Sequence, residues 1–423
     1  MQDLPKTIPY LLMAGLLLST ACGPQDPNDE NDNDEEAVDE THYYEDRTHA
    51  YFDFPEVPGQ LDLIETEDQD FYKDVVAEGF KVPWGFAFLE EGKAIVSERE
   101  ATLHVIEDGE KRDEPVNNLP DNIFVGNQAG LLDLTAHPDY EENGWIYMAY
   151  AYEGDEGNNT ALARARLEDN ALHDKEVLMK ADPEIPGGRH LGSRIVFKDE
   201  YVFFNTADRG RKDPAQDSTN TSGSVIRLYH DGEVPEDNPF QDVEGAAPEI
   251  YTYGHRNPQG MDLHPETNEL WLNEHGPKGG DEINIVKAGE NYGWPEMTYG
   301  IDYDGSVITE DTLVDGMEPC IHHWTPSIAP SGKSFVDGDR YPGWEKSILH
   351  GALANQHVNR TVYNLEQEGL DMITHEERIL EDIGRVRDIN TGPDGYIYIS
   401  VEESGAGEED GRIIRFLPVE EDV

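Results

Sequence analysis

Two short runs of alternating apolar and polar residues, separated by a polar turn, recur six times along the chain. Alternation with a period of two residues is typical of β-strands, whose successive side chains point to opposite faces of a sheet. The 3.6-residue periodicity of long amphipathic helices is nearly absent. The pattern therefore predicts an all-β fold of repeated strand pairs, at residues 85–98, 132–150, 194–206, 260–273, 334–352 and 388–401.

The strand pairs also share turns and composition. Several turns begin with His or Gly, continue with Pro and end with Asp or Glu, and the second strands often carry aromatic residues. Six such units, spaced by roughly 50–70 residues, are typical of a six-bladed β-propeller of four-stranded antiparallel blades. A β-sandwich would need fewer and more evenly spaced strands. We expect residues 72–76 to pair with residues 412–417 and so to close the last blade.

The first 22 residues predict a secretory signal. An apolar run at residues 8–18 is too short to span a bilayer and is followed by small residues. The segment from Ser19 to Cys22 resembles a bacterial lipobox, although Ser19 stands where Leu is usual. A plain cleaved signal is the alternative. In either case we expect an extracytoplasmic protein, at the cell surface or in the periplasm, whose contact with the membrane is a lipid anchor on Cys22.

Acidic residues dominate the composition. The 90 Asp and Glu outnumber 31 Lys and Arg, for a formal net charge of −59, which argues against nucleic acid or an anionic membrane surface as a partner. We place a disordered acidic tether at residues 23–70 and the propeller at residues 71–423. Because acids are spread along the whole chain, we hypothesise a halophilic adaptation, which unfolding midpoints that do not rise with NaCl would contradict.

Cysteine is nearly absent. Cys320 is the one cysteine besides Cys22, so a lipidated Cys22 would leave no disulfide within a monomer. Cys320 is then expected to be a small buried hydrophobic residue.

Two unusual loops flank the fourth strand pair, within residues 251–295. The loop at 254–260 offers Arg256 beside Asn257, and the loop at 274–282 combines three glycines with Asp281 and Glu282. Arginine suits a planar carboxylate, whereas exposed carbonyls and carboxylates suit Ca²⁺. An anion and a hard cation bound side by side is one interpretation. The other is that both loops are ordinary connections between blades.

Three ordered motifs in this stretch carry a family resemblance. The segments GHRNPQG (254–260), EHGPKGGDEIN (274–284) and NYGWP (291–295) closely resemble those of the soluble pyrroloquinoline quinone (PQQ)-dependent sugar dehydrogenases, the glucose/aldose dehydrogenase family. The resemblance extends, with gaps, over roughly residues 81–418. It implies a six-bladed propeller with PQQ and Ca²⁺ (calcium) as cofactors. It also implies an oxidoreductase that oxidises the C1 hydroxyl of aldose sugars to lactones and passes electrons to an external acceptor, a quinone or a cytochrome.

The resemblance implies three catalytic residues. His190 lies in a glycine-rich loop and stands where the family keeps its catalytic base; taken alone, a loop histidine is more often a surface residue. Asp208 matches the carboxylate that orients the base. Arg256 would stabilise the oxyanion that develops on the cofactor. Arg189 departs from the pattern, because a glucose dehydrogenase of this family has Asp before the base.

The resemblance also implies a set of cofactor-binding residues. PQQ carries three carboxylates and an ortho-quinone, so it needs several cations at fixed positions. Arg385 and Arg387 would face the same way on a strand, with a solvated strand edge as the alternative interpretation. A lysine of the glucose-specific members has no clear counterpart near residues 352–356. The full predicted set is Gln128, Arg256, Asn257, Ser327, Arg385 and Arg387.

Two calcium sites follow from the same resemblance. The carbonyl groups of Gly276 and Pro277 match the pair that binds the ion beside PQQ. Glu282, the carbonyl group of Tyr292 and Asp302 match a second, structural site. Alternatively, Glu282 and Asp302 are two more surface acids among the 90.

Two other functions remain open from the residues alone. A propeller at the cell surface could bind polysaccharide or a protein partner without catalysis, and it would need no ordered set of cofactor-binding cations. A calcium-dependent lactonase would need several carboxylates that converge on a central ion, whereas the candidate ligands near Gly276 are carbonyl groups.

Overall fold

A computed structural model describes residues 51–52, 61–403 and 408–419. All of them belong to one compact unit, residues 46–423. The predicted signal, the lipidated Cys22 and most of the predicted tether lie outside the described residues. Within the described part of the chain, no helix is long and apolar enough to cross a membrane.

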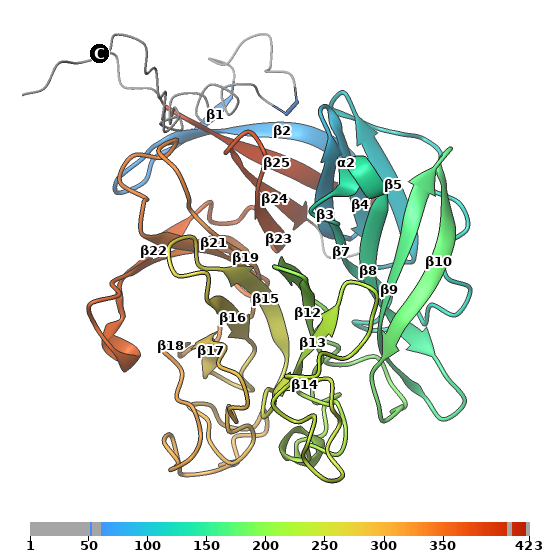
Figure 1. Cartoon of the computed structure of the whole chain (residues 1–423). Coiled ribbons are helices and arrows are strands. Elements are labelled where there is room, and N and C mark those ends of the chain that lie inside the picture. Colours follow the sequence, from blue (N-terminus) through green and yellow to red (C-terminus); the bar gives the residue numbers. More distant parts are fainter. Residues whose placement is uncertain (1–50, 53–60, 404–407, 420–423) are drawn as a thin grey trace, which may run out of the picture. The chain divides into compact units, whose positions relative to one another are not determined.

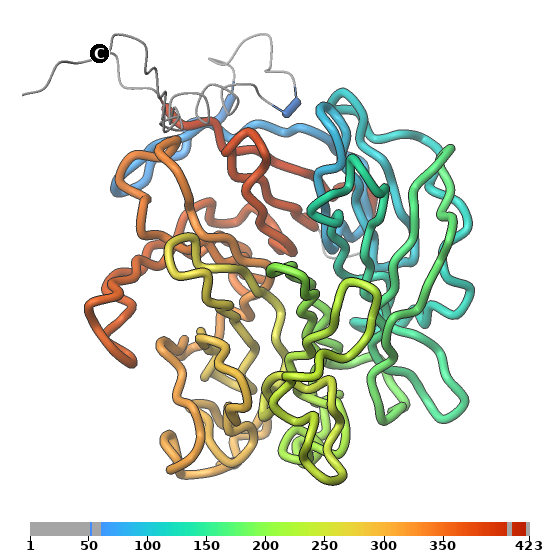
Figure 2. The backbone as a smooth tube through the Cα atoms, viewed as in Figure 1, coloured from blue at the N-terminus to red at the C-terminus, as the bar shows by residue number. Residues whose placement is uncertain are grey.

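Six antiparallel sheets surround a central axis in the described residues, which confirms the predicted six-bladed β-propeller (Figures 1 and 2). The first blade contains β3 (Pro83–Glu90), β4 (Lys93–Glu98), β5 (Thr102–Glu107) and β6 (Glu110–Lys111). The second contains β7 (Leu131–Ala136), β8 (Trp145–Glu153), β9 (Asn158–Glu168) and β10 (Ala171–Lys180), with the short helix α2 (Tyr140–Asn143) between β7 and β8. The third contains β11 (Ile195–Lys198), β12 (Tyr201–Asn205), β13 (Val225–Tyr229) and β14 (Ile250–Thr252), with the 3-10 helix η3 (Asp213–Gln216).

The second half of the chain completes the ring. The fourth blade contains β15 (Pro258–Leu263), β16 (Leu270–Glu274), β17 (Asp281–Ile285) and β18 (His322–Trp324). The fifth contains β19 (Pro330–Phe335), β20 (Ser347–Ala352), β21 (His357–Tyr363) and β22 (Ile373–Ile379), with the 3-10 helix η4 (Gly369–Asp371). The sixth contains β23 (Arg385–Thr391), β24 (Ile397–Glu402), β25 (Gly411–Pro418), β2 (Phe71–Phe80) and β1 (Asp62–Ile64). The six predicted strand pairs are the first two strands of the six blades.

The sixth blade joins the two ends of the chain. Strand β2 pairs antiparallel with β25, with Tyr72 opposite Leu417, as the sequence predicted. Strand β1 pairs with β2, and Tyr51 and Phe52 are buried. The folded unit therefore takes in residues that the sequence analysis assigned to the tether at 23–70.

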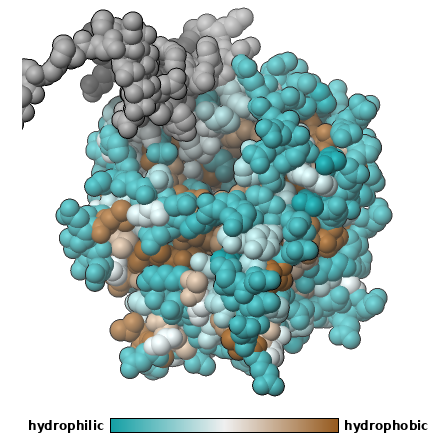
Figure 3. Space-filling view, viewed as in Figure 1, coloured by the Kyte–Doolittle hydropathy of each residue, from teal (hydrophilic) through white to brown (hydrophobic). Residues whose placement is uncertain are grey.

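The core lies between neighbouring blades. Strands β8 and β24 are buried along almost their whole length, because each blade is covered on both faces by its neighbours. A cluster between the second and third blades, for example, packs Tyr147 and Leu162 against Phe204. Cys320 is buried, as predicted, and is a free thiol. The face of the molecule shown in Figure 3 is mostly hydrophilic, with scattered hydrophobic side chains.

One buried histidine between the fourth and fifth blades makes stability depend on pH. His350 Nδ1 accepts a hydrogen bond from Asn273 Nδ2, in the side chain, at 3.1 Å. The other ring nitrogen of His350, Nε2, lies 3.1 Å from Thr361 Oγ1. Burial and the nearby Lys333 ammonium group lower the pKa of His350 well below its usual value. The folded state therefore keeps this imidazole neutral, whereas the unfolded chain binds a proton below about pH 6.5.

We expect the stability of the wild type relative to a His350→Gln variant to fall as the pH is lowered from 7 to 5. The unfolded wild type gains a proton over this range that the folded state does not bind. The difference in the free energy of unfolding between the two proteins should therefore change by at most about 1.4 kcal/mol per pH unit. Urea unfolding of both proteins at pH 7, 6 and 5 measures this difference. A constant difference between the two proteins would contradict the neutral assignment.

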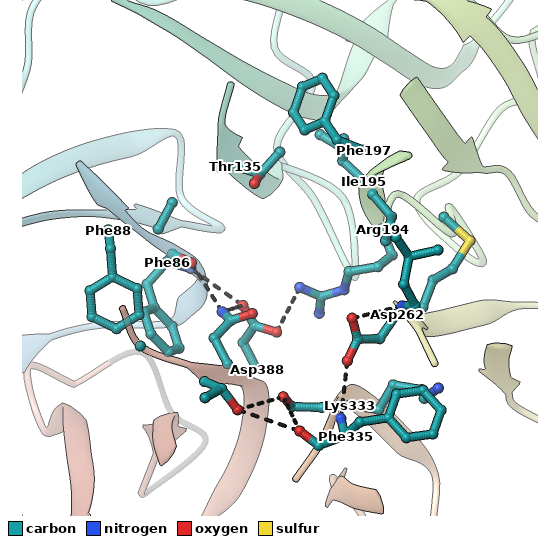
Figure 4. Close-up of a pocket in the computed structure, with 18 of the residues that line it drawn as sticks. Phe86, Phe88, Thr135, Arg194, Ile195, Phe197, Asp262, Lys333, Phe335 and Asp388 are labelled. Atoms are coloured by element: carbon teal, nitrogen blue, oxygen red, sulfur yellow. Dashed lines mark hydrogen bonds and ion pairs between the residues drawn. The ribbon is translucent and has the colours of Figure 1, made fainter. Parts of the chain in front are cut away.

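Ion pairs between the inner strands cross the central channel. Arg194, just before β11, lies 2.7 Å from Asp133 on β7 and 2.6 Å from Asp388 on β23, and all three are buried. These residues line a cavity of about 640 Å³ together with Asp262 and Lys333, which Figure 4 shows. Burial raises the pKa of Asp133 to about 7 and lowers that of Lys333 to about 7. Through its two ion pairs, Arg194 of the third blade connects the second and sixth blades.

Candidate active site

A buried carboxylate holds the predicted base. His190 Nδ1 lies 2.6 Å from Asp208 Oδ1, and the His190 side chain is 14% exposed whereas that of Asp208 is 1% exposed. Asp208 also accepts hydrogen bonds from Trp294 Nε1 at 2.8 Å and from the Gly210 amide at 2.7 Å. Burial alone would raise the pKa of Asp208, but the hydrogen bond from His190 and the nearby Arg256 lower it overall. An ionised Asp208 fixes the proton on Nδ1 and leaves Nε2 as the acceptor.

The loop that carries His190 has an unusual backbone. His190 has a φ of +50°, which few residues other than glycine adopt. Gln128 Oε1 accepts the His190 amide at 2.9 Å, and the buried Arg209 donates to Gly187 O at 2.8 Å and to His190 O at 3.3 Å. A Cβ on Gly188 would lie 2.0 Å from Gly126 O, so only glycine fits there. The surrounding structure therefore holds the imidazole in one place.

Arg256 connects the base to the glycine-rich loop at 274–282. The Asp208 amide donates to Arg256 O at 2.9 Å, and Arg256 Nη1 donates to Gly276 O at 2.7 Å. Glu274 accepts the Arg256 amide at 2.6 Å and His255 Nδ1 at 2.8 Å. Arg256 Nε is buried without a hydrogen-bond partner in the described residues. This buried N–H group lacks the hydrogen-bond partner that such donors usually have.

A cavity of about 640 Å³ lies at the start of the inner strands, next to this network. It is lined by four of the predicted cofactor-binding residues, which come from the second, fourth and sixth blades. These are Gln128, Asn257, Arg385 and Arg387. Its further lining includes Trp84, Arg99, Gln259, His275, Gln356 and Glu402. The cavity of Figure 4 lies farther along the same strands, and Arg194 Nε donates to Gln259 O between the two cavities.

The charges in the cavity at the strand starts are mainly positive. Arg387 Nε donates to Glu402 Oε2 at 2.9 Å, and Arg385 Nη1 donates to Leu353 O at 3.2 Å. Burial lowers the pKa of Arg387 to about 10, so it stays charged at neutral pH. With Arg99, three guanidinium groups share the cavity with one lining carboxylate, Glu402. Such a set favours an anionic ligand.

His275 marks where the predicted residues converge. Its Nε2 lies 2.7 Å from Pro330 O, and its Nδ1 lies 3.4 Å from Asn257 Nδ2. Burial lowers the pKa of His275 to about 3, with contributions from Arg256, His190 and Arg385. These three residues, which belong to the third, fourth and sixth blades, are therefore all close to one imidazole.

Ser327 takes part in the support of the glycine-rich loop. Its hydroxyl donates to the Asp281 carboxylate at 2.5 Å, and Asp281 also accepts the Gly276 amide at 2.8 Å. The amides of Ile328 and Ala329 donate to the same carboxylate at 2.8 Å. Asp281 therefore sets the position of the Gly276 and Pro277 carbonyl groups, the predicted ligands of the ion beside the cofactor. Ser327 does not line the cavity at the start of the inner strands.

The residues of the second predicted calcium site are only partly together. Glu282 and Tyr292 line a small cavity of about 10 Å³ with Arg256 and Gly276. Burial and the facing Glu274 raise the pKa of Glu282 well above its usual value. Asp302 is outside this lining, and Lys212 Nζ lies 2.6 Å from its carboxylate. Within the described residues, no group of three or more His, Cys, Asp or Glu is placed to hold a metal.

Comparison with known proteins decides the family. The family model described as "Glucose / Sorbosone dehydrogenase" matches residues 80–415, most of the propeller. The chain belongs to the glucose/sorbosone dehydrogenase family. This membership makes it an oxidoreductase of the sugar dehydrogenase type and confirms the resemblance that the three motifs carried.

The chain is also similar to individual members of known function and structure. It is 38% identical over 353 residues to aldose sugar dehydrogenase YliI of Escherichia coli (strain K12), an alignment that covers 82% of this chain and 92% of the relative. The crystal structure of the soluble aldose sugar dehydrogenase from Escherichia coli in the apo-form superposes with a TM-score of 0.77 at 35% identity, covering 82% of this chain and all of the other. The PQQ-bound aldose sugar dehydrogenase from Streptomyces coelicolor has a TM-score of 0.67 at 24% identity, covering 84% of this chain and 100% of the other, and shows a shared fold.

The cavity at the strand starts also fits the cofactor that the family resemblance implies. A tricarboxylate needs several fixed cations, and Arg99, Arg385 and Arg387 line this space. Its volume is within the range of pockets that hold small molecules. Arg256 does not line this cavity; it lines the adjoining cavity of about 10 Å³, where its Nη1 donates to the Gly276 carbonyl group. The residues present are therefore suited to PQQ.

Several site residues escaped the sequence analysis. Trp294 and His275 lie within the motifs NYGWP and EHGPKGGDEIN, so the motifs contained a signal for them. Trp84, Arg99 and Glu402 come from the first and last blades, in segments without a distinctive motif. Only the closure of the ring brings those three to the cavity.

Proposed function

We propose that the protein is a PQQ-dependent dehydrogenase that oxidises the C1 hydroxyl of aldose sugars to lactones and passes the electrons to an external acceptor. The observation that carries the proposal is the hydrogen-bonded pair of His190 and Asp208 next to the cavity at the strand starts, which Arg99, Arg385 and Arg387 line. The names of the relatives agree with it, since one is an aldose sugar dehydrogenase of Escherichia coli and another is a PQQ-bound enzyme.

In this proposal, His190 is the general base. Its Nδ1 proton is held by Asp208, so Nε2 accepts the C1 hydroxyl proton of the sugar as hydride leaves C1. The buried Asp208 stabilises the imidazolium that forms. PQQ supplies the two-electron acceptor for the hydride when it is bound.

The remaining predicted residues would hold and polarise the cofactor. Arg385 and Arg387 would bind its carboxylates, with Gln128 and Asn257 as uncharged partners in the same cavity. Arg256 would donate to the oxyanion that develops during reduction, from a position fixed by Glu274. Ca²⁺ would be held by the carbonyl groups of Gly276 and Pro277, which the Asp281 carboxylate positions.

Reconstitution tests this function. We expect the purified protein to reduce a redox dye in the presence of an aldose only after PQQ and Ca²⁺ are both added. Protein with Ca²⁺ alone, and protein with PQQ and a chelator, are the controls. The lactone product is measured by its alkaline hydrolysis.

The rival functions predict different results in the same assay. A carbohydrate- or protein-binding propeller would not reduce the dye under any of these conditions. A calcium-dependent lactonase would hydrolyse lactones without PQQ. Either result would overturn the proposed dehydrogenase activity.

A further inference from the structure

The first blade contributes a cation to the cavity at the strand starts. Arg99 lines it together with Arg385 and Arg387 of the sixth blade, and the Arg99 and Arg385 guanidinium groups are electrostatic neighbours of Arg387. The cavity wall at Leu353, Ala354 and Gln356 carries no charge. Among the described residues that line this cavity, two arginines, Arg385 and Arg387, lie on β23, and the third, Arg99, comes from the first blade.

The fold holds the backbone of Arg99 firmly. Arg99 begins the turn between β4 and β5, and its amide donates to Val82 O at 3.1 Å. A Cβ on Gly130 would lie 1.6 Å from Arg99 O, so the turn packs directly against the glycine backbone. Glu98 braces the same turn through a hydrogen bond from Thr102 Oγ1 at 2.5 Å. The backbone of Arg99 is therefore already ordered before a ligand binds, which lowers the entropy lost on binding.

The side chain of Arg99 is only partly satisfied. Its Nη2 lies 2.9 Å from Glu100 Oε1, and the side chains are 23% and 32% exposed. The structure gives no other hydrogen-bond partner for the Arg99 guanidinium group among the described residues, and Glu100 Oε2 is buried without a partner. A weak, partly exposed ion pair leaves several N–H groups of Arg99 for a ligand carboxylate.

We propose that Arg99 binds a carboxylate of the quinone cofactor from the first-blade wall of the cavity, beside Arg385 and Arg387 of the sixth blade, and that Glu100 competes with that carboxylate for the guanidinium group. The inference rests on the proposed PQQ-dependent function. It gives the tricarboxylate a cation from the first blade. A cofactor held in this way would link the first and sixth blades, which only the ring closure makes neighbours.

The test is the dissociation constant for PQQ, measured by titrating the full-length protein in Ca²⁺ and following the absorbance of the cofactor. We expect Arg99→Gln to weaken binding by about 10- to 100-fold, as is usual for a lost hydrogen bond between charged groups. Arg99→Lys should recover part of the lost affinity, because lysine keeps the positive charge but lacks the paired N–H donors of a guanidinium group. Glu100→Gln should bind PQQ up to about tenfold more tightly than the wild type, since a competing carboxylate is gone.

Arg166→Gln is the matched control. Arg166 also forms a partly exposed ion pair, with Asp174 at 3.1 Å, but it lies on β9 and outside the cavity lining. Wild-type affinity in Arg99→Gln, or an equal loss in Arg166→Gln, would overturn the role of Arg99. Unchanged or weakened binding of PQQ by Glu100→Gln would overturn the competition. If the wild type binds no PQQ, the proposed function fails as well, so the two failures are distinguishable.

Discussion

Replacing His190 by glutamine is expected to lower the turnover number of the reconstituted enzyme by about 10²–10⁴-fold, the usual contribution of a general base. Glutamine can still hydrogen-bond to Asp208, but it cannot accept the hydroxyl proton of the sugar. The affinity for PQQ should stay within about twofold, because His190 does not line the cavity that holds the arginines. Steady-state rates with an aldose and a redox dye, together with PQQ titration, measure both quantities.

His173→Gln is the control for this variant. His173 lies on β10 and is exposed, so its replacement should leave turnover unchanged. An Asp208→Asn variant should also lose activity, because an uncharged amide would not stabilise the imidazolium. Near-normal turnover in His190→Gln, at normal cofactor content, would rule out His190 as the base.

Replacing Arg194 by methionine is expected to lower the free energy of unfolding by about 3–5 kcal/mol at pH 7.5, the usual cost of removing one partner from a buried ion pair. The variant leaves Asp133 and Asp388 facing each other without their shared cation, and both carboxylates are buried. Protonation removes this repulsion, so the loss should be smaller at pH 5 than at pH 7.5. Urea unfolding of the cofactor-free proteins at both pH values gives the comparison.

Two further variants separate charge from packing in the Arg194 cluster. In Arg194→Met/Asp133→Asn/Asp388→Asn the unpaired charges are gone, and we expect most of the lost stability to return. Arg166→Met removes a partly exposed arginine from its pair with Asp174 and should change stability by less than about 1 kcal/mol. An equal loss in the single and triple variants would show that the Arg194 side chain acts through packing alone.

Much of the fold could be predicted because its unit is local. A strand, a turn and a second strand lie within about twenty residues, so the alternation of side chains reports them directly. The pairing of β2 with β25 was also predicted, from the way that propellers close. The end of the tether was not, because burial of Tyr51 and Phe52 depends on partners more than 300 residues away, such as Asp394 and Arg415.

The site divides in the same way. His190, Arg256, Asn257 and Gly276 stand in motifs whose glycine and charge pattern was readable from the chain. Arg99 and Glu402 had no such signal. For Asp302 the motif position was readable, yet in the structure its carboxylate pairs with Lys212, 90 residues earlier.

The amino-acid sequence by itself determined the number of blades, the strands that form them and the loops that offer guanidinium and carbonyl groups, because these depend on neighbours along the chain. Only the tertiary structure decided that Asp281 holds both the Gly276 and the Ser327 loops, and that arginines of the first and sixth blades share one cavity. The reason is that the Ser327 loop lies 46 residues after Asp281 and that the first and sixth blades become neighbours when the ring closes, and no local pattern encodes either approach.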